Sequence, residues 1–259
     1  MRARKWWEIV GVALLVGAFM AGTKPPPAPP LILRTQAHHI PKVIALTFDD
    51  GPSPKYTQAI LSLLTRYHAH ATFFVLGTEV AQWPNVAKDI VKQGSVVAFH
   101  GYHHVNYFHI GVGGVTQDLE RLKALLKKEK IPTVPFYRPP YGNSNQALVK
   151  AMSRRGYTVT LWSIDTRDWA MPGTSFITKK VLANAAPGSI VLMHDSGGNR
   201  TETVQALAAI LPVLKSEGYQ LVTLPQYVKD LGLKAPPKLP LPATPAGSPS
   251  KHKAAGPVI

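Results

Sequence analysis

The sequence predicts an α/β fold, a distorted (β/α) barrel of about seven parallel strands. Short apolar runs alternate with amphipathic segments along the middle of the chain, which is typical of parallel strands joined by crossover helices. The runs are continuously apolar, as expected for strands that are covered on both faces. An open doubly wound sheet is the second choice, because the G-x-G-x-x-G fingerprint of open dinucleotide-binding folds is missing.

Each predicted strand is a short apolar run rich in Val, Ile, Leu or aromatic residues and bounded by turn residues. The first (KVIALTF), second (ATFFVLG), third (SVVAFH) and fourth (VPFYR) all precede polar clusters or amphipathic segments. The longer run YTVTLWSID is read as a single fifth strand. In order, the predicted strands are residues 42–48, 71–77, 95–100, 134–138, 157–165, 189–195 and 219–224.

Each predicted helix is an amphipathic segment that follows one of these strands, with Gly or Pro near its ends. Its position between two strands makes it a crossover connection. In order, the predicted helices are residues 56–67, 85–94, 115–129, 145–156, 176–185, 203–218 and 225–232.

Length and composition fit one sizeable folded domain. The chain has 259 residues, and α/β barrels of about 200 to 250 residues form single domains. The sequence contains no cysteine, which excludes disulfides, thiolate zinc sites, a cysteine nucleophile and lipidated cysteines. Any metal ion must therefore be held by nitrogen and oxygen atoms.

The first 22 residues predict export. Arg2, Arg4 and Lys5 precede an apolar run at residues 9–21, as in a secretory signal. A cleavage-site pattern is poorly defined and the apolar run is nearly long enough to span a bilayer, so a cleaved signal peptide and an uncleaved membrane anchor both stay open. We expect the protein to be extracellular, associated with the cell wall, or anchored to the outer face of the plasma membrane.

The remaining terminal segments are Pro-rich. Residues 23–40 predict an extended linker, residues 41–231 the folded catalytic domain, and residues 232–259 a basic, disordered tail. Net charge is +15, and much of it lies in the two ends. This charge suits an anionic cell-envelope surface, and no motif indicates a nucleic-acid partner.

Polar side chains collect at the carboxyl ends of the predicted strands, where parallel α/β folds bind their ligands. One such cluster could be structural, but five at corresponding positions predict a functional site. The clusters are Asp49 and Asp50; His100, His103 and His104; Arg138 and Tyr141; Asp165, Asp168 and Trp169; and His194 and Asp195.

Two of these histidines predict a metal site. His100 and His104 are four residues apart, so one helical turn would aim both imidazoles the same way, and a carboxylate from elsewhere would complete the ligand set. His103 is less suitably spaced. These nitrogen and oxygen donors suit a divalent cation, with Zn²⁺ expected first and Co²⁺, Ni²⁺ or Fe²⁺ left open.

Five motifs together resemble the polysaccharide deacetylase family, also called the NodB-homology domain or carbohydrate esterase family 4. They are TFDDGP, H-x-x-x-H, R-P-P-Y, D-x-x-D-W and the apolar run that ends in His194, in the family's order and spacing. The resemblance covers about residues 41–231. It implies a distorted barrel that uses a metal-activated water to hydrolyse N-acetyl groups of N-acetylglucosamine residues in a polysaccharide, releasing acetate.

The resemblance also implies a role for each motif residue. Adjacent residues at a strand end point to opposite faces, so two neighbouring carboxylates can do different jobs. The implied roles are metal ligands for Asp50, His100 and His104; general base for Asp49, oriented by Arg138, which also keeps it ionised; general acid for His194, oriented by Asp168; backbone oxyanion donor for Tyr141; and substrate contacts for Trp169, Leu192 and Tyr141.

The chain departs from the family pattern beside the first metal histidine. Gly101 stands where the family usually has Ser or Thr, and Ala98 and Phe99 stand where it usually has Gly-Asn. Such supporting positions affect metal affinity and activity. Peptidoglycan is the expected substrate, because the basic ends and the export signal suit a bacterial envelope protein. A chitin-oligomer deacetylase, or a weakly active glycan-binding member of the family, is the alternative.

Overall fold

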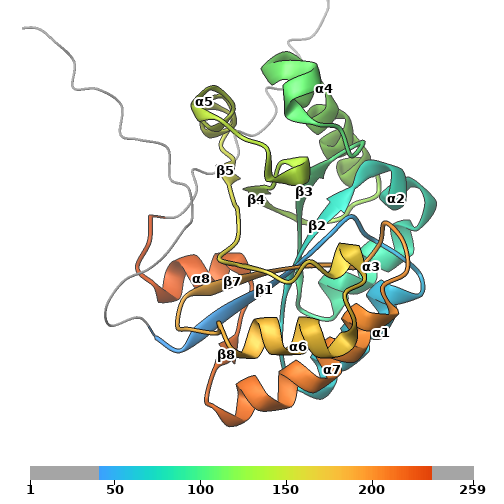
Figure 1. Ribbon diagram of the computed structural model, residues 1–259. Helices are drawn as coiled ribbons and strands as arrows, with labels where there is room; N and C mark the ends of the chain where they lie inside the picture. The colour runs from blue at the N-terminus through green and yellow to red at the C-terminus, as the bar shows by residue number, and fades with distance from the viewer. Residues whose placement is uncertain (1–40, 235–259) are drawn as a thin grey trace, which may run out of the picture.

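Eight strands form one sheet in the part of the chain that the structure, a computed structural model, describes, residues 41–234 (Figure 1). All paired strands are parallel. The segments predicted at residues 1–22 and 23–40, and residues 235–259 of the predicted tail, lie outside the described residues. The strands are β1 (Val43–Asp49), β2 (Thr72–Leu76), β3 (Val96–Gly101), β4 (Thr133–Tyr137), β5 (Thr158–Val159), β6 (Ile164–Asp165), β7 (Ser189–His194) and β8 (Gln220–Leu221).

The sheet is curled into a half-barrel, which confirms the predicted distorted barrel. Its order is β5-β4-β3-β2-β1-β7-β6, and the short β8 pairs with the start of β1. Within the described residues, β5 and β6 form the two edges and do not pair with each other. The central strand β1 therefore pairs with a strand on each side, and its carboxyl end lies in the middle of the edge that the carboxyl ends of the strands form.

The single strand predicted at residues 157–165 is wrong, because this segment supplies both edges of the sheet. β5 pairs with β4, whereas β6 pairs with β7. The four residues between them cross the open side of the half-barrel: Thr160 N–H donates to the carbonyl of Tyr137 in β4, and Ser163 N–H donates to the carbonyl of Ile190 in β7. The apolar character of residues 157–165 did not show that the chain leaves the edge strand beside β4 and continues into the edge strand beside β7.

Helices return the chain from the end of one strand to the start of another (Figure 1). Two differ from the prediction: α2 was not expected, and α4 begins earlier with a capped turn that a kink at Gly111 (φ 61°) separates from the rest of the helix. The Asn106 side chain caps this turn by accepting a hydrogen bond from Phe108 N–H. No helix within residues 41–234 combines the length and apolarity needed to span a membrane. The helices are α1 (Tyr56–Arg66), α2 (Gly77–Gln82), α3 (Pro84–Lys92), α4 (Tyr107–Lys128), α5 (Gln146–Arg154), α6 (Thr174–Leu182), α7 (Thr201–Ser216) and α8 (Leu224–Asp230).

Both faces of the sheet are buried, as continuously apolar strands require. Along β1, Ile44, Leu46 and Phe48 belong to the large outer core under the helices. The alternate residues Val43 and Ala45 face the inside of the half-barrel, where α8 packs against them. Helix α8 therefore closes the inner face of the sheet and leaves the carboxyl edge open.

We predict that Leu224→Ala lowers the free energy of unfolding by about 2–5 kcal/mol, the usual cost of truncating a buried leucine. Leu224 is fully buried in the inner core, and its N–H donates to Thr72 Oγ1 at 2.9 Å. Chemical denaturation measures the change. Lys229→Ala, at an exposed position of the same helix, is the control. Equal stabilities of the two variants would contradict the assignment of α8 as the inner cover.

Candidate active site

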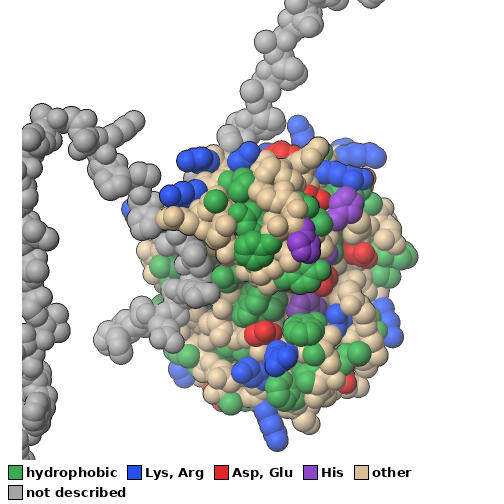
Figure 2. Space-filling model, turned by 45° about the horizontal axis from the view of Figure 1, so that its top comes forward, with side chains coloured by type: hydrophobic (Ala, Val, Ile, Leu, Met, Phe, Trp, Pro, Cys, Tyr) green, Lys and Arg blue, Asp and Glu red, His purple; other side chains and the backbone are tan. Residues whose placement is uncertain are grey.

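A cleft of about 630 Å³ opens at the carboxyl edge of the sheet. In Figure 2 histidine and acidic side chains gather in and beside a hollow that hydrophobic side chains flank. The strands converge there because all are parallel, so residues far apart in sequence become neighbours. Of the residues predicted from the sequence, the cleft is lined by Asp49, Asp50, His100, His104, Tyr141, Asp165, Trp169, Leu192 and His194.

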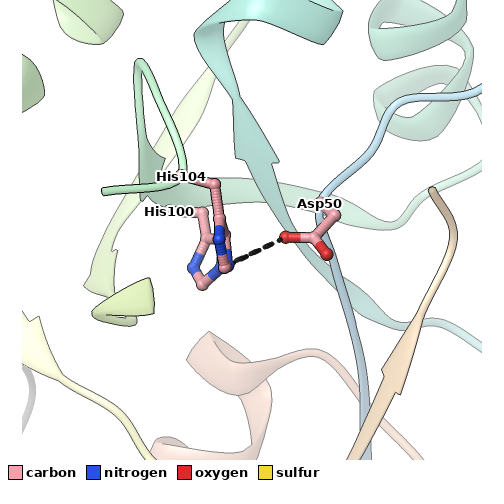
Figure 3. A group of neighbouring side chains, drawn as sticks. All are labelled: Asp50, His100 and His104. Atoms are coloured by element: carbon pink, nitrogen blue, oxygen red, sulfur yellow. Dashed lines mark ion pairs between the residues drawn. The ribbon is translucent and has the colours of Figure 1, made fainter. Parts of the chain in front are cut away.

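Asp50, His100 and His104 form a group that could hold a metal ion (Figure 3). One candidate ligand atom from each lies within 4.8 Å of the others. Asp50 Oδ1 is 3.4 Å from His100 Nε2 and 3.5 Å from His104 Nε2. Two imidazole nitrogens and one carboxylate oxygen, open to a cleft, are the donor set of a catalytic metal site.

The polar atoms of this group fit a cation. Asp50 Oδ1 is buried and has no hydrogen-bond partner among the described residues, although burying such an atom without one is costly. Burial alone would raise the pKa of Asp50, but interaction with the nearby histidines, His100 above all, lowers it to about 2. Burial lowers the pKa of His104, which favours the neutral imidazole that binds metals.

The backbone that carries the two histidines differs from the predicted helical turn. His100 lies on β3, but His104 lies on the loop after it, so no helical turn aligns them. His100 Nδ1–H donates to the carbonyl of Arg138 at 2.8 Å, which leaves Nε2 free toward the cleft. His103 lies outside the group: its half-exposed side chain pairs with Asp118 at 2.9 Å.

Asp50 does not continue the alternation of β1. The strand ends at Asp49, and Asp50 has a φ of 74°, in the left-handed region that few residues other than glycine adopt. The following turn is tightly filled, because a Cβ at Gly51 would overlap the carboxylate of Asp195. The expected difference between the two adjacent carboxylates is therefore produced by a local turn of the backbone and not by strand alternation.

Asp49 is held from behind by a buried guanidinium. Arg138 Nη1 donates to Asp49 Oδ1 at 2.7 Å and to Thr47 Oγ1 at 2.8 Å. Arg138 is fully buried and Asp49 nearly so. No hydrogen bond to Asp49 Oδ2 is found within residues 41–234. One carboxylate oxygen is thus fixed, and the other could accept a proton.

His194 is held by Asp168 in the same manner. Its Nδ1–H donates to Asp168 Oδ1 at 2.7 Å, its backbone N–H donates to Oδ2 at 2.8 Å, and Thr203 Oγ1 also donates to Oδ2 at 2.8 Å. Burial opposes protonation of His194, but the hydrogen bond and charge of Asp168 outweigh it and raise the pKa of the imidazole. The protonated ring could act as an acid at the cleft.

Tyr141 lies in the short 3₁₀ turn Pro140–Gly142 with a φ of 60°. Its ring is exposed and lies 4.4 Å from the His104 ring, centroid to centroid. Trp169 is also exposed, whereas Leu192 is buried at the cleft floor. These side chains offer apolar surface to a ligand at the point where the polar groups converge.

Three charged or aromatic residues of the cleft, Glu79, Trp162 and Arg200, were not singled out from the sequence. Glu79 comes from the unpredicted helix α2, and Trp162 comes from the segment misread as a continuous strand. Arg200 fixes the loop after β7 by donating to the carbonyls of Ser196 and Gly197 at 2.7 and 2.8 Å. Their positions depend on the turns that the periodicity did not resolve, and no motif marked them.

Comparison with known proteins shows the family to which this chain is similar. The family model described as polysaccharide deacetylase matches residues 36–160. A peptidoglycan-N-acetylglucosamine deacetylase from Bacillus cereus is 42% identical over 73% of this chain and 89% of its own length. A chitooligosaccharide deacetylase from a Bradyrhizobium species is 34% identical over 71% and 89%. The solved structure of a peptidoglycan N-acetylglucosamine deacetylase superposes with a TM-score of 0.70 at 33% identity, over 75% of this chain and 90% of that one.

We predict that the protein binds one Zn²⁺ per chain and that His100→Ala or Asp50→Asn weakens this binding by at least about 100-fold, because losing even an outer-shell partner typically costs 10- to 100-fold. Competition with a chromophoric chelator measures the affinity. His109→Ala, an exposed histidine on α4, is the matched control. Zn²⁺ binding that survives the loss of His100 or Asp50 would place the metal elsewhere.

Proposed function

The chain belongs to the polysaccharide deacetylase family and is a hydrolase, and on this premise we propose that it removes N-acetyl groups from N-acetylglucosamine residues of peptidoglycan, releasing acetate. The observation that carries the proposal is the convergence of a candidate base, a candidate acid and a candidate metal group in one cleft. Hydrolysis of an amide needs an activated water, a polarised carbonyl and an acid for the leaving nitrogen, and these three groups would supply them.

Peptidoglycan is favoured over chitin oligomers by similarity. The Bacillus cereus relative, whose name specifies peptidoglycan, is more similar to this chain than the chitooligosaccharide deacetylase. A protein that only binds glycan is the second candidate, favoured by the altered residues Phe99 and Gly101 beside His100. Against it, binding alone requires neither a carboxylate fixed by Arg138 nor a histidine fixed by Asp168.

Asp50, His100 and His104 would hold a divalent cation, and we propose Zn²⁺ for this mixed nitrogen and oxygen set. When bound, such an ion lowers the pKa of water and polarises an amide carbonyl. Asp49 Oδ2 would take a proton from the attacking water, while Arg138 holds Oδ1 through a hydrogen bond. The water oxygen then bonds to the acetyl carbon.

His194 completes the reaction by giving its proton to the sugar nitrogen as the carbon–nitrogen bond breaks, which yields acetate and a free amine. Asp168 fixes Nδ1, so the other ring nitrogen faces the cleft. The backbone N–H of Tyr141 has no partner among the described residues and is positioned to donate to the developing oxyanion. Trp169, Leu192 and the Tyr141 ring would pack against the acetyl methyl and the sugar.

We also propose that the domain works outside the plasma membrane, close to an anionic envelope surface. The export pattern of residues 1–22 supports this, whether it is cleaved or remains as an anchor. Charge on the domain supports it too, since crossover helices end at the edge opposite the cleft and carry basic residues in their last turns. These are Arg66, Lys92, Lys127, Lys128, Arg154, Lys179, Lys180 and Lys215.

We predict that Asp49→Asn and His194→Ala each lower kcat for acetate release by about 100- to 10,000-fold, the usual contribution of a general base or acid. Release is measured from N-acetylglucosamine oligomers and from purified peptidoglycan, with Zn²⁺ restored after chelation. Both variants should keep Zn²⁺ affinity within a few fold of the wild type, because neither side chain belongs to the metal group.

His109→Ala serves as the control variant and should keep wild-type turnover. A metal-loaded wild type that binds glycan but releases no acetate from either substrate would replace the deacetylase proposal with the glycan-binding one. Faster release from chitin oligomers than from peptidoglycan would reverse the substrate preference.

For the N-terminus, we predict that the protein produced in a bacterial host is recovered from the envelope. Intact mass spectrometry of that protein separates the two readings of residues 1–22. A mature chain lacking them indicates a cleaved signal, and a full-length chain in the membrane fraction indicates an anchor. Recovery of the full chain only from the cytoplasm would contradict export.

A further inference from the structure

The loop at residues 101–104 decides where the second metal histidine points. His100 is oriented by its own hydrogen bond to the Arg138 carbonyl. For His104, by contrast, no hydrogen bond of the ring is found within residues 41–234; its contacts are the ion pair with Asp50 and the ring of Tyr141. The direction of the His104 imidazole is therefore set by the backbone that carries it.

The carboxylate of Asp118, on α4, accepts hydrogen bonds from that backbone. Asp118 Oδ2 accepts a hydrogen bond from Tyr102 N–H at 2.6 Å, and the His103 N–H lies 3.2 and 3.3 Å from the two carboxylate oxygens. Asp118 Oδ1 also accepts from His103 Nδ1–H at 2.9 Å. The Asp118 side chain is only 13% exposed and its bond to Tyr102 N–H is partly buried, whereas its bonds to His103 lie at the surface.

The loop is shaped around this carboxylate. Gly101 has a φ of 128°, which residues with a Cβ rarely adopt, and a Cβ there would lie 2.7 Å from Asp118 Oδ2. On the other side, Thr78 N–H of α2 donates to the Tyr102 carbonyl at 3.0 Å. Tyr102 is thus fixed through both its backbone groups, two residues before His104.

We propose that Asp118 is a positioning residue that fixes loop 101–104 and thereby sets the metal affinity of the site. The inference rests on the metal group assigned to the proposed function. It gives a second anchor to the site: the Arg138 carbonyl orients His100 directly, and Asp118 orients His104 through the loop. Outer partners of this kind hold the ligands in a geometry that the metal would otherwise have to impose.

The test measures metal binding in Asp118→Ala and Asp118→Asn. We expect Zn²⁺ affinity to fall about 10- to 100-fold in Asp118→Ala. Asp118→Asn keeps the shape but presents an amide NH₂ in place of one accepting oxygen, so we expect a loss of about 10-fold. The visible absorption spectrum of the Co²⁺-loaded variants reports ligand geometry and should shift as well. Asp89→Asn, a half-buried carboxylate on α3 that accepts from Gln58, is the matched control.

Thermal unfolding of the metal-free proteins separates positioning from general stability. The proposal expects a large change in metal affinity even where the metal-free Asp118→Asn and Asp89→Asn unfold at similar temperatures. A folded Asp118 variant that keeps the wild-type Zn²⁺ affinity and Co²⁺ spectrum would overturn the proposal. If Asp118→Ala does not fold, the same comparison is made with Asp118→Asn alone. A wild type that binds metal but releases no acetate would refute the proposed function and still leave this comparison decisive.

Discussion

The buried guanidinium of Arg138 is the interaction on which the rest of the site depends. It ties Asp49 and Thr47 of β1 to the carbonyls of Thr160 and Leu161, which lie where the chain crosses the open side of the half-barrel. Its own carbonyl orients His100. A fully buried cation is tolerated only because a carboxylate and several oxygens satisfy it, and removing one partner of such a pair costs about 3–5 kcal/mol. Fold closure and catalytic geometry therefore share one side chain.

Most of the fold could be predicted because the sequence repeats one local pattern, an apolar strand followed by an amphipathic helix. Parallel strands buried on both faces and the helices between them differ in periodicity, and that difference located the main elements. The prediction failed where structure depends on distant contacts. The split of residues 157–165 into β5 and β6 requires two different partner strands, β4 and β7. Helix α2 is short and begins at Gly77, which packs against Tyr102, so apolar periodicity did not mark it.

The candidate site was predicted at the level of residues and less well at the level of geometry. Motif residues were found because they stand at strand ends, and the cleft brings them together. The left-handed backbone of Asp50, the loop that carries His104 and the carboxylate of Asp118 were not predicted. Asp118 follows His104 on a different element and belongs to no strand-end cluster, so its role emerges only when α4 packs beside the loop. Supporting residues are set by tertiary contacts, which local spacing does not encode.

The central claim is a division of labour in which Asp50 binds the metal and Asp49 does not. It is tested most directly by an anomalous-difference map from crystals of the Zn²⁺-loaded protein, recorded for the wild type and for Asp49→Asn. We expect one peak bonded to Asp50, His100 and His104 in both crystals, with residue 49 outside bonding distance. A peak coordinated by Asp49, or a peak lost in Asp49→Asn, would contradict the assignment of Asp49 as the base.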